Sequence, residues 1–411
     1  MRLVQKILIK HNKNQKETFD FWLRRCKTLY NTALEQRIES YNKLQVSINY
    51  FDQKKELPLL KIEDESWKDI PNKSLSETLE RLDKAFKKFF KEHKTNGVGF
   101  PKYKNNDNFK SVYFVKTDIK IVDNKHIKLP KIKQNIVLNE ELKDINLQFT
   151  SVNLIKESDN KYYLVFNYED NKEPICYDYE NDINLKSIGI DLGLKTLSTD
   201  SDGYKINRFS SKLVKKYTDR IVELNQSLSK TVKGSKNRKK VKKQLSKAHR
   251  RLKNTRVDYQ NKEVKKYVDK MIVDEVKCVA LGDIKVKDII TKKDKPKDNS
   301  KPTKPIKSKR FLRRSFNNNG LSEFKVKLIN KCESKGIKVY KVKENYTSKT
   351  CSCCGLVDDK LKLSDRVFNC KNCKISVDRD VNGSINIKAV WQGQFKPYRL
   401  DSQMEKRFVS L

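Results

Sequence analysis

The segment SIGIDLGLKTLSTD, residues 187–200, predicts the centre of the fold. Ile188 and Ile190 are apolar positions of a buried β-strand that ends at Asp191. The chain then turns at Gly193 and continues as a second strand. A carboxylate at the exposed end of a buried strand is a candidate metal ligand. The alternative is an ordinary solvated Asp, because polar residues of this kind are common in turns.

Two downstream segments strengthen the interpretation of Asp191 as a ligand. The motif DRDVNG, residues 378–383, opens a C-terminal helix and offers Asp380 as a second carboxylate. Two Cys-x-x-Cys pairs precede it, Cys351/Cys354 and Cys370/Cys373. The order of Asp strand, cysteine pairs and DRDxNG helix is more specific than any of its parts.

Charge indicates a polyanionic partner. The chain has 411 residues, enough for two or three domains, with 92 Lys and Arg against 52 Asp and Glu and a net charge of +40. Abundant solvated lysine explains part of this content but not the imbalance. Nucleic acid is the expected partner.

No secretory signal or membrane-spanning run is visible, because the apolar residues of segment 1–10 alternate with polar ones and the segment is too short. We therefore expect an intracellular protein with no membrane partner. In a reducing compartment the cysteines are expected to bind metal rather than form disulfides.

The N-terminal half predicts a β-barrel formed by residues 1–10 and 105–180, with a helical insertion at 11–104. Apolar residues at helical spacing predict one helix around Phe19–Ile38 and another around Leu75–Phe90. The second helix also carries a basic face, which is either a solvated surface or a nucleic-acid contact.

The C-terminal half predicts three strands within residues 187–208, followed by a long helical region. Between Lys230 and Arg256 there are thirteen basic residues and no acidic ones. We favour a helical hairpin along a phosphate backbone over a solvated or disordered run, since apolar residues recur there at helical spacing. Residues 291–319 lack periodicity and are expected to form a mobile loop.

Two further strands are expected at 278–281 and 337–342, on either side of a helix at 321–335. The strand at 278–281 runs into Gly282 and Asp283. The strand at 337–342 delivers Glu344 just after its end.

The cysteine spacing predicts a structural zinc site. Cys351/Cys354 and Cys370/Cys373 are separated by fifteen residues, and two such turns can complete a tetrahedron around Zn²⁺. Cys353 is an alternative ligand to Cys354. Coincidental cysteines and a redox role are the competing interpretations, and both fit two closely spaced pairs poorly.

The chain resembles TnpB, the RNA-guided nuclease of bacterial transposons, and its eukaryotic relatives the Fanzor proteins; type V CRISPR effectors are more distant. The motifs that carry this resemblance are GIDLGLK (189–195), RRLKNTR (250–256), YTSKTCSCCG (346–355) and DRDVNGSINI (378–387). Weaker similarities lie at 30–34 and 99–104.

This resemblance implies an α+β multidomain fold with a wedge barrel, a helical recognition insertion, an RNase H-like (RuvC) domain at 185–411 and a zinc ribbon at 346–377 within it. It implies Mg²⁺-dependent cleavage of DNA that matches a bound guide RNA, beside a short flanking motif. The expected partners are a guide RNA and double-stranded target DNA, with one chain per guide RNA. The compartment would be the bacterial cytoplasm or nucleoid, or a eukaryotic nucleus.

One position departs from the family. A RuvC site needs about three carboxylates to hold two Mg²⁺ ions, and Asp191 and Asp380 supply two. The family's third ligand is usually a Glu after the strand at 278–281, where this chain has Gly282. The neighbouring Asp283 should face the other side of the strand, which makes it a minor candidate.

Glu344 is the candidate for the missing ligand, in an arrangement that resembles the rearranged site of Fanzors and some TnpB proteins. The alternative is a surface Glu among lysines in a nuclease-dead, RNA-guided DNA-binding repressor. A strand-transferring transposase is a weaker third class. We favour the endonuclease with Asp191, Glu344 and Asp380 as catalytic residues, because both other carboxylates are retained. Asp378 is expected to act from behind Asp380, and Arg379 and Asn382 are expected to orient phosphate or metal ligands.

Overall fold

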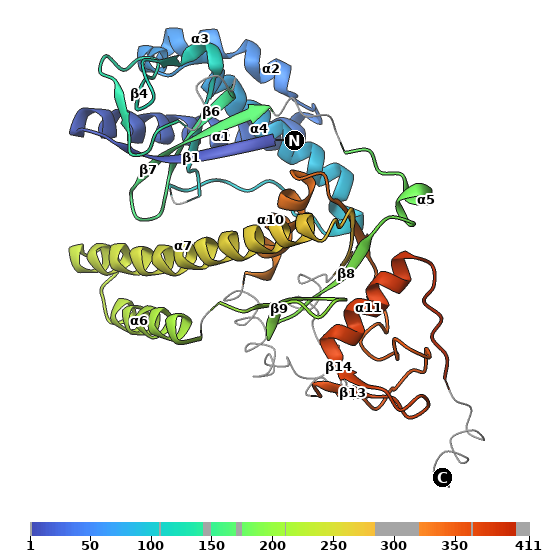
Figure 1. Cartoon of the computed structure of the whole chain (residues 1–411). Coiled ribbons are helices and arrows are strands. Elements are labelled where there is room, and N and C mark those ends of the chain that lie inside the picture. The colour runs from blue at the N-terminus through green and yellow to red at the C-terminus, as the bar shows by residue number, and fades with distance from the viewer. Residues whose placement is uncertain are drawn as a thin grey trace, which may run out of the picture. The chain divides into compact units, whose positions relative to one another are not determined.

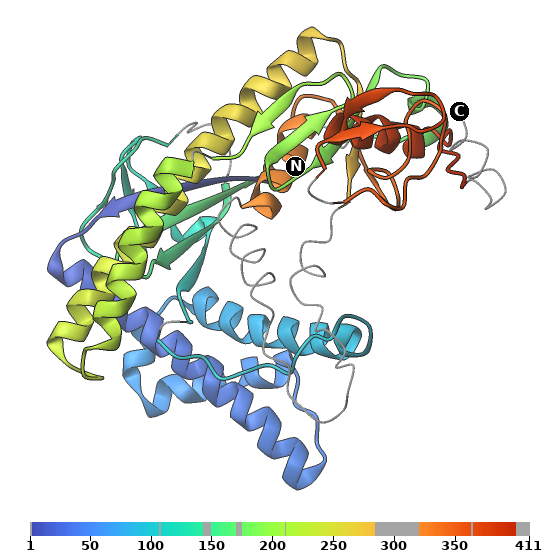
Figure 2. The ribbon, with the colours of Figure 1, turned by 90° about the horizontal axis from the view of Figure 1, so that it is seen from below.

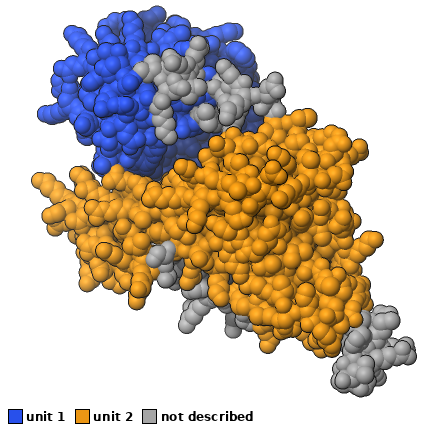
Figure 3. All heavy atoms as spheres, viewed as in Figure 1, with its two compact units in different colours: residues 1–172 blue, residues 173–411 orange. Residues whose placement is uncertain are grey.

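The computed structural model shows two compact units, residues 1–172 and 173–411, referred to below as unit 1 and unit 2 (Figure 3). Both units mix helices and sheets, so the expected α+β class is confirmed. The structure describes residues 2–106, 108–142, 149–169, 175–209, 211–283, 320–362 and 365–399. The expected loop at 291–319 lies outside these residues.

Unit 1 contains a seven-stranded sheet in the order β2-β6-β7-β1-β5-β4-β3. The N-terminal strand lies inside this sheet, antiparallel to both β7 and β5, which confirms that segment 1–10 returns to the later strands. β6 and β7 form an antiparallel hairpin. The strands are β1 (Arg2–Lys10), β2 (Ser111–Val115), β3 (Lys120–Ile121), β4 (His126–Lys128), β5 (Ile136–Leu138), β6 (Phe149–Lys156) and β7 (Tyr162–Glu169).

The helices of unit 1 pack on this sheet through a large aromatic core. Trp22 of α1 is fully buried and contacts Phe114 of β2 edge to face, with ring centroids 5.5 Å apart. Asn12 caps α1 through a capping box with Gln15. The helical elements are α1 (Lys13–Leu44), α2 (Tyr50–Lys55), α3 (Leu57–Glu63), η1 (Glu65–Asp69), α4 (Asn72–Asn96) and η2 (Lys116–Asp118).

Unit 2 contains a five-stranded sheet in the order β10-β9-β8-β11-β12. β8, β9 and β10 are antiparallel, whereas β8, β11 and β12 run parallel. The strands are β8 (Ser187–Leu192), β9 (Thr196–Asp200), β10 (Lys205–Asn207), β11 (Cys278–Gly282) and β12 (Lys338–Val342). The carboxyl ends of the three parallel strands meet at one edge, so Asp191, Gly282 and the residues after Val342 come together there.

α6 and the long helix α7 lie side by side as a helical hairpin (Figures 1 and 2). The basic run 230–256, for which a hairpin was predicted, instead forms the connecting turn and the first part of α7. α10 packs on α7, and α11 packs across β8. The remaining elements are α5 (Tyr179–Asp182), α6 (Ser211–Ser229), α7 (Lys236–Val273), α10 (Leu321–Glu333), α11 (Arg379–Trp391) and the small β13–β14 sheet (Val367–Asn369 and Ser376–Asp378). None of the helices described here is long and apolar enough to cross a bilayer.

The close approach of α11 to β8 depends on Gly189. A Cβ atom at this position would lie 2.0 Å from the carbonyl oxygen of Ser384, which is a severe overlap with helix backbone. A glycine is therefore required for α11 to lie directly on the strand that ends at Asp191.

Candidate functional site

Three carboxylates come from three different elements at this edge of the unit 2 sheet. Asp191 lies near the end of β8, Asp380 lies in the first turn of α11, and Glu344 follows β12 by two residues. Gly383 leaves room for Asp191, since a Cβ atom at 383 would lie 3.2 Å from the Asp191 Oδ2 atom. The structure thus brings the tip of β8 against the first turn of α11.

The electrostatics show that these acids affect one another. Burial, and then the nearby carboxylate of Asp380, raise the pKa of Asp191 to about 7, against the opposing effect of Arg379. Burial, and then the carboxylate of Asp191, raise the pKa of Glu344 to about 8, with Lys325 acting in the opposite direction. Like charges held together in a partly buried site are characteristic of a cation-binding or catalytic centre.

The side chain of Glu344 turns into the sheet edge rather than toward solvent. Its Oε1 atom is buried and has no hydrogen-bond partner among the described residues. It occupies the space beside Gly282, where a Cβ atom would lie only 1.7 Å from it. The following turn fixes the backbone, because the Thr347 hydroxyl donates to the Glu344 carbonyl oxygen over 3.1 Å.

The other acids near the site have structural partners. Asp378 caps α11, and its Oδ1 atom accepts from the backbone N–H of Asp380 over 2.9 Å. Its Oδ2 atom accepts from Lys205 over 2.6 Å. The carboxylate of Asp283 pairs with Lys325 of α10. Asp380 itself accepts from the Thr196 hydroxyl over 3.3 Å, which orients one of its oxygens.

The four predicted cysteine ligands form a tight group. The Sγ atoms of Cys351, Cys354, Cys370 and Cys373 all lie within 4.8 Å of one another, and this group contains Cys354 rather than Cys353. The closest pairs are 3.6 Å (Cys351 to Cys373) and 3.5 Å (Cys354 to Cys370). Tetrahedral Zn²⁺ with Zn–S bonds of about 2.3 Å separates its sulfurs by about 3.8 Å, so these cysteines could hold a zinc ion.

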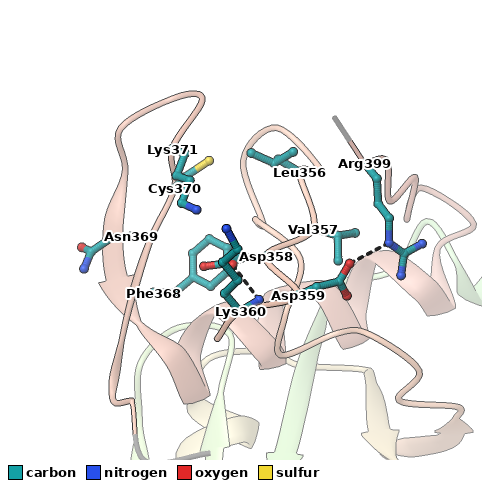
Figure 4. Close-up of a pocket in the computed structure, with 10 residues that line it drawn as sticks. All are labelled: Leu356, Val357, Asp358, Asp359, Lys360, Phe368, Asn369, Cys370, Lys371 and Arg399. Atoms are coloured by element: carbon teal, nitrogen blue, oxygen red, sulfur yellow. Dashed lines mark hydrogen bonds and ion pairs between the residues drawn. The ribbon is translucent and has the colours of Figure 1, made fainter. Parts of the chain in front are cut away.

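Thiolate formation is favoured at two cysteines of this group, Cys354 and Cys373, whose pKa values both lie below the ordinary value. Burial opposes ionisation of Cys354, but the backbone N–H of Leu356 and the neighbouring thiols lower its pKa to about 6. A shallow hollow beside the group is lined by apolar Leu356 and Phe368 and by the ion pair of Asp359 with Arg399 (Figure 4).

Two asparagines of α11 connect this segment to the acidic site. Asn382 is fully buried, donates to the Thr350 carbonyl over 2.7 Å and accepts from the Ser352 N–H over 2.9 Å. Asn386, one turn further along, donates to the carbonyls of Thr347 and Thr350. The sequence suggested that Asn382 orients phosphate or metal ligands, and it did not predict this contact with the backbone of the cysteine-bearing segment. The i, i+4 spacing of Asn382 and Asn386, which places them on the same face of the helix, was the one sequence feature that could have indicated it.

Arg379 also has a backbone role. Its guanidinium donates to the carbonyls of Lys362 and Asp365, over 3.0 and 3.4 Å. The side chain thereby ties the cysteine-bearing segment to the start of α11. Its charge also lowers the pKa of Asp191, so it supports the ionised form of that carboxylate.

Two segments of the chain match known protein families. Residues 322–387 match the family described as Cas12f1-like, TNB domain, and residues 170–292 match the family described as probable transposase. The first segment spans Glu344 and all four cysteines, and the second spans Asp191 and Gly282. These matches confirm the resemblance that the motifs of the C-terminal half indicate.

Longer similarities cover most of the chain. The chain is 28% identical over 372 residues to a protein of Escherichia coli (strain K12) named putative RNA-guided DNA endonuclease InsQ, covering 89% of this chain and 86% of that one. It is 25% identical over 366 residues to a putative RNA-guided DNA endonuclease of Streptomyces pristinaespiralis, covering 88% and 82%. The structure of the mini-RNA-guided endonuclease CRISPR-Cas_phi3 shares the fold, with a TM-score of 0.50 at 10% identity over 97% of this chain and 94% of that one.

Proposed function

We propose that this chain, a relative of the TnpB-like proteins, is an RNA-guided DNA endonuclease with Asp191, Glu344 and Asp380 as its catalytic carboxylates. The observation that carries the proposal is the placement of Glu344, whose Oε1 atom is buried and unpartnered and whose pKa is raised by burial and by the carboxylate of Asp191. A surface Glu among lysines would turn toward solvent or pair with them. A half-buried acid whose pKa is raised by burial and by a second acid is typical of cation-binding and catalytic sites.

The residues present fit divalent metal ions. Hard oxygen donors from Asp191, Asp380 and Glu344 are the ligands that Mg²⁺ prefers, and the buried Oε1 atom of Glu344 has no hydrogen-bond partner among the described residues. The chemistry supplied by bound Mg²⁺ would be activation of the attacking water and stabilisation of the leaving oxygen. The hydroxyl of Thr196 and the cap at Asp378 would hold Asp380 in place for that task.

The ligand atoms of Asp191, Glu344 and Asp380 do not all lie as close together as those of the four cysteines. Among the described residues, the four cysteines alone form a group of three or more whose ligand atoms all lie within 4.8 Å. A two-metal site does not demand such a group, because its ions lie about 3.5–4 Å apart and each ligand needs to reach only one of them.

The same proposal assigns a role to each of the other domains of the chain. The five-stranded sheet has the strand order and directions of an RNase H-like domain, which we place at 185–411, with a zinc ribbon at 346–377 held by the four cysteines. Residues 1–10 and 105–180 would form the wedge barrel around the helical insertion at 11–104. The relatives' names support a guide RNA and target DNA as partners, and the net charge of +40 suits both.

Cleavage of plasmid DNA by the full chain with its copurified RNA tests this function. A library of flanking sequences would serve as target, with Mg²⁺ present, for the wild type, Glu344→Ala and the control Glu180→Ala, which changes an exposed glutamate of unit 2. We expect the wild type and the control to cut, and Glu344→Ala to bind the target but cut at least 100-fold more slowly.

The second candidate function is that of an RNA-guided DNA-binding repressor. It is suggested by Gly282, which stands where the family usually has its third carboxylate ligand. If the wild type binds its target tightly and never cuts, the chain is a guided repressor and the endonuclease proposal is wrong. Cutting that survives Glu344→Ala would transfer the role to another acid, with Asp283 the first to test.

A further inference from the structure

Gly282 is the last residue of β11, paired in parallel with Val342 of β12. Its backbone does not lie in the left-handed region, so chain conformation alone does not call for glycine here. The constraint is one of space. A Cβ atom at 282 would lie 1.7 Å from Oε1, 2.7 Å from Cδ and 3.0 Å from Cγ of Glu344.

We propose that Gly282 is a positioning residue, which keeps open the space that the Glu344 carboxylate needs in order to reach Asp191. The consequence is a rule of mutual exclusion: a side chain at 282 and the buried placement of Glu344 cannot coexist. The proposal rests on the function proposed above, and it adds that the glycine is a required part of the site rather than the trace of a lost ligand.

The sheet register explains why the space beside Gly282 decides whether Glu344 can reach Asp191. Leu281 lies opposite Ile190 in the parallel pair of β11 and β8, so the next residues, Gly282 and Asp191, follow at the same edge. Glu344 starts one strand further away, on the far side of β11 from β8. Its side chain therefore has to pass over the end of β11 to approach Asp191, and a residue with a side chain at that end would block the path.

Alanine at 282 should move Glu344 without unfolding the protein. The three atoms that meet the added Cβ all belong to one long, flexible side chain, and no backbone atom is among them. Glu344 can rotate toward solvent, which also ends the burial of its carboxyl group. Replacing glycine by alanine at an ordinary backbone conformation restricts the unfolded chain. Gly282→Ala should therefore be as stable as the wild type, or more so, while its metal site is lost.

A glutamate at 282 should take over the role of Glu344. In Gly282→Glu alone, Glu344 rotates toward solvent and the carboxylate at 282, which starts directly beside the strand of Asp191, occupies the space. In the double variant Gly282→Glu, Glu344→Ala no second carboxylate competes for that space. We expect the double variant to regain the metal site that Glu344→Ala loses.

Iron-directed protein cleavage measures metal binding at the site and does not depend on nuclease activity. Fe²⁺ replaces Mg²⁺, and with ascorbate and hydrogen peroxide it generates hydroxyl radicals that cut the polypeptide beside the bound ion. The full chain with its RNA would be treated, the fragments mapped by mass spectrometry, and urea unfolding and DNA cleavage measured in parallel. The matched control is Gly99→Ala, at a glycine with an ordinary φ and no atom within 4 Å of its Cβ position.

We expect cuts near 191, 282 and 344 in the wild type and in Gly99→Ala. Gly282→Ala and Glu344→Ala should show at least tenfold fewer cuts there, with unchanged or higher urea midpoints, and the double variant should recover them. Cuts and DNA cleavage at wild-type level in Gly282→Ala would overturn this inference and leave the proposed function intact. Absence of local cuts in the wild type, or their persistence in Glu344→Ala, would overturn the metal assignment itself and this inference with it.

Discussion

Asn382 links the two candidate sites at the scale of a single residue. Its amide holds Thr350 and Ser352, which flank Cys351, the first of the four clustered cysteines, while its helix carries Asp380. The side chain is completely buried. Its removal leaves the Ser352 N–H without this acceptor, whereas the Thr350 carbonyl keeps its hydrogen bond from Asn386. An unsatisfied buried polar group costs more than the hydrogen bond itself contributes.

We therefore expect Asn382→Ala to destabilise unit 2 by about 2 kcal/mol and to speed zinc loss to a chelator. Urea unfolding and a colorimetric zinc-release assay would measure the two effects. Asn369→Ala is the matched control, because Asn369 is an exposed asparagine of the same segment (Figure 4). Equal zinc release from both variants would contradict the anchoring role.

Asp20 provides a pH-dependent contact in unit 1. Burial alone would raise the pKa of this carboxyl, but hydrogen bonds from Lys156 and Tyr162 outweigh burial and hold the pKa below its ordinary value. A carboxylate with a lowered pKa in the folded protein stabilises the fold above the pKa of the unfolded chain, near 4. That contribution is lost as the pH falls through the lower, folded value.

Asp20→Asn should accordingly lower the unfolding free energy by about 2 kcal/mol at pH 7, and by much less at pH 3. Chemical denaturation at both pH values would show this, with Glu140→Gln as a control at an exposed carboxylate. A loss of stability that is the same at both pH values would mean that Asp20 contributes by packing rather than by charge.

At the scale of elements, the cysteine-bearing segment has little else to hold it together. Its apolar core consists of Cys351, Leu356, Phe368 and Cys370, supported by a two-stranded sheet of three residues per strand. A core of this size cannot offset the conformational entropy of the segment, so the proposed zinc would supply its folding energy.

Zinc removal should therefore loosen this segment and leave the rest of the chain folded. With phenanthroline present, we expect limited proteolysis to cut first between residues 350 and 377, whereas peptides of unit 1 stay protected. Added Zn²⁺ should restore resistance. Mass spectrometry of the fragments would detect either result, and simultaneous cutting in both units would contradict a local role for zinc.

Elements set by local patterns could be predicted from the sequence. The strands at 136–138 and 278–281 and the helix at 321–335 have apolar runs or helical spacing that no tertiary contact overrides. The short helices between residues 50 and 69 had no such signal, because they are only one or two turns long. Tertiary contacts hold them: α2 packs on α4, and Gln53 and Asp69 are hydrogen-bonded to α1.

The candidate site could be predicted only in part, for a related reason. Asp191, Asp380 and the cysteines lie in motifs whose spacing reflects local geometry. Glu344 follows from its place after a strand. The dependence of Glu344 on Gly282 could not be predicted. The two residues are 62 positions apart in the sequence and meet only because β11 and β12 pair side by side, and one sequence alone gives no information on that contact.

At the scale of the whole molecule, a net charge of +40 predicts binding to nucleic acid that weakens steeply with salt. This charge can attract nucleic acid in two ways: through the overall field of the protein, or through direct contacts between particular lysines and phosphates. The helix α7 presents exposed lysines along its first turns, among them Lys239, Lys242, Lys243 and Lys247. If α7 lies along a phosphate backbone, each lysine displaces counterions directly.

Replacing these four lysines by alanine should then reduce the slope of log affinity against log salt by about 3 to 4, since each phosphate contact contributes about 0.7 to 0.9. Filter binding or fluorescence anisotropy of target DNA over a range of salt concentrations would measure the slope. The control removes four exposed lysines of unit 1 (Lys55, Lys120, Lys128 and Lys133), which changes the net charge equally. A slope that falls by the same amount in both variants would mean that α7 contributes only to the overall field, because only direct contacts make the position of a charge matter.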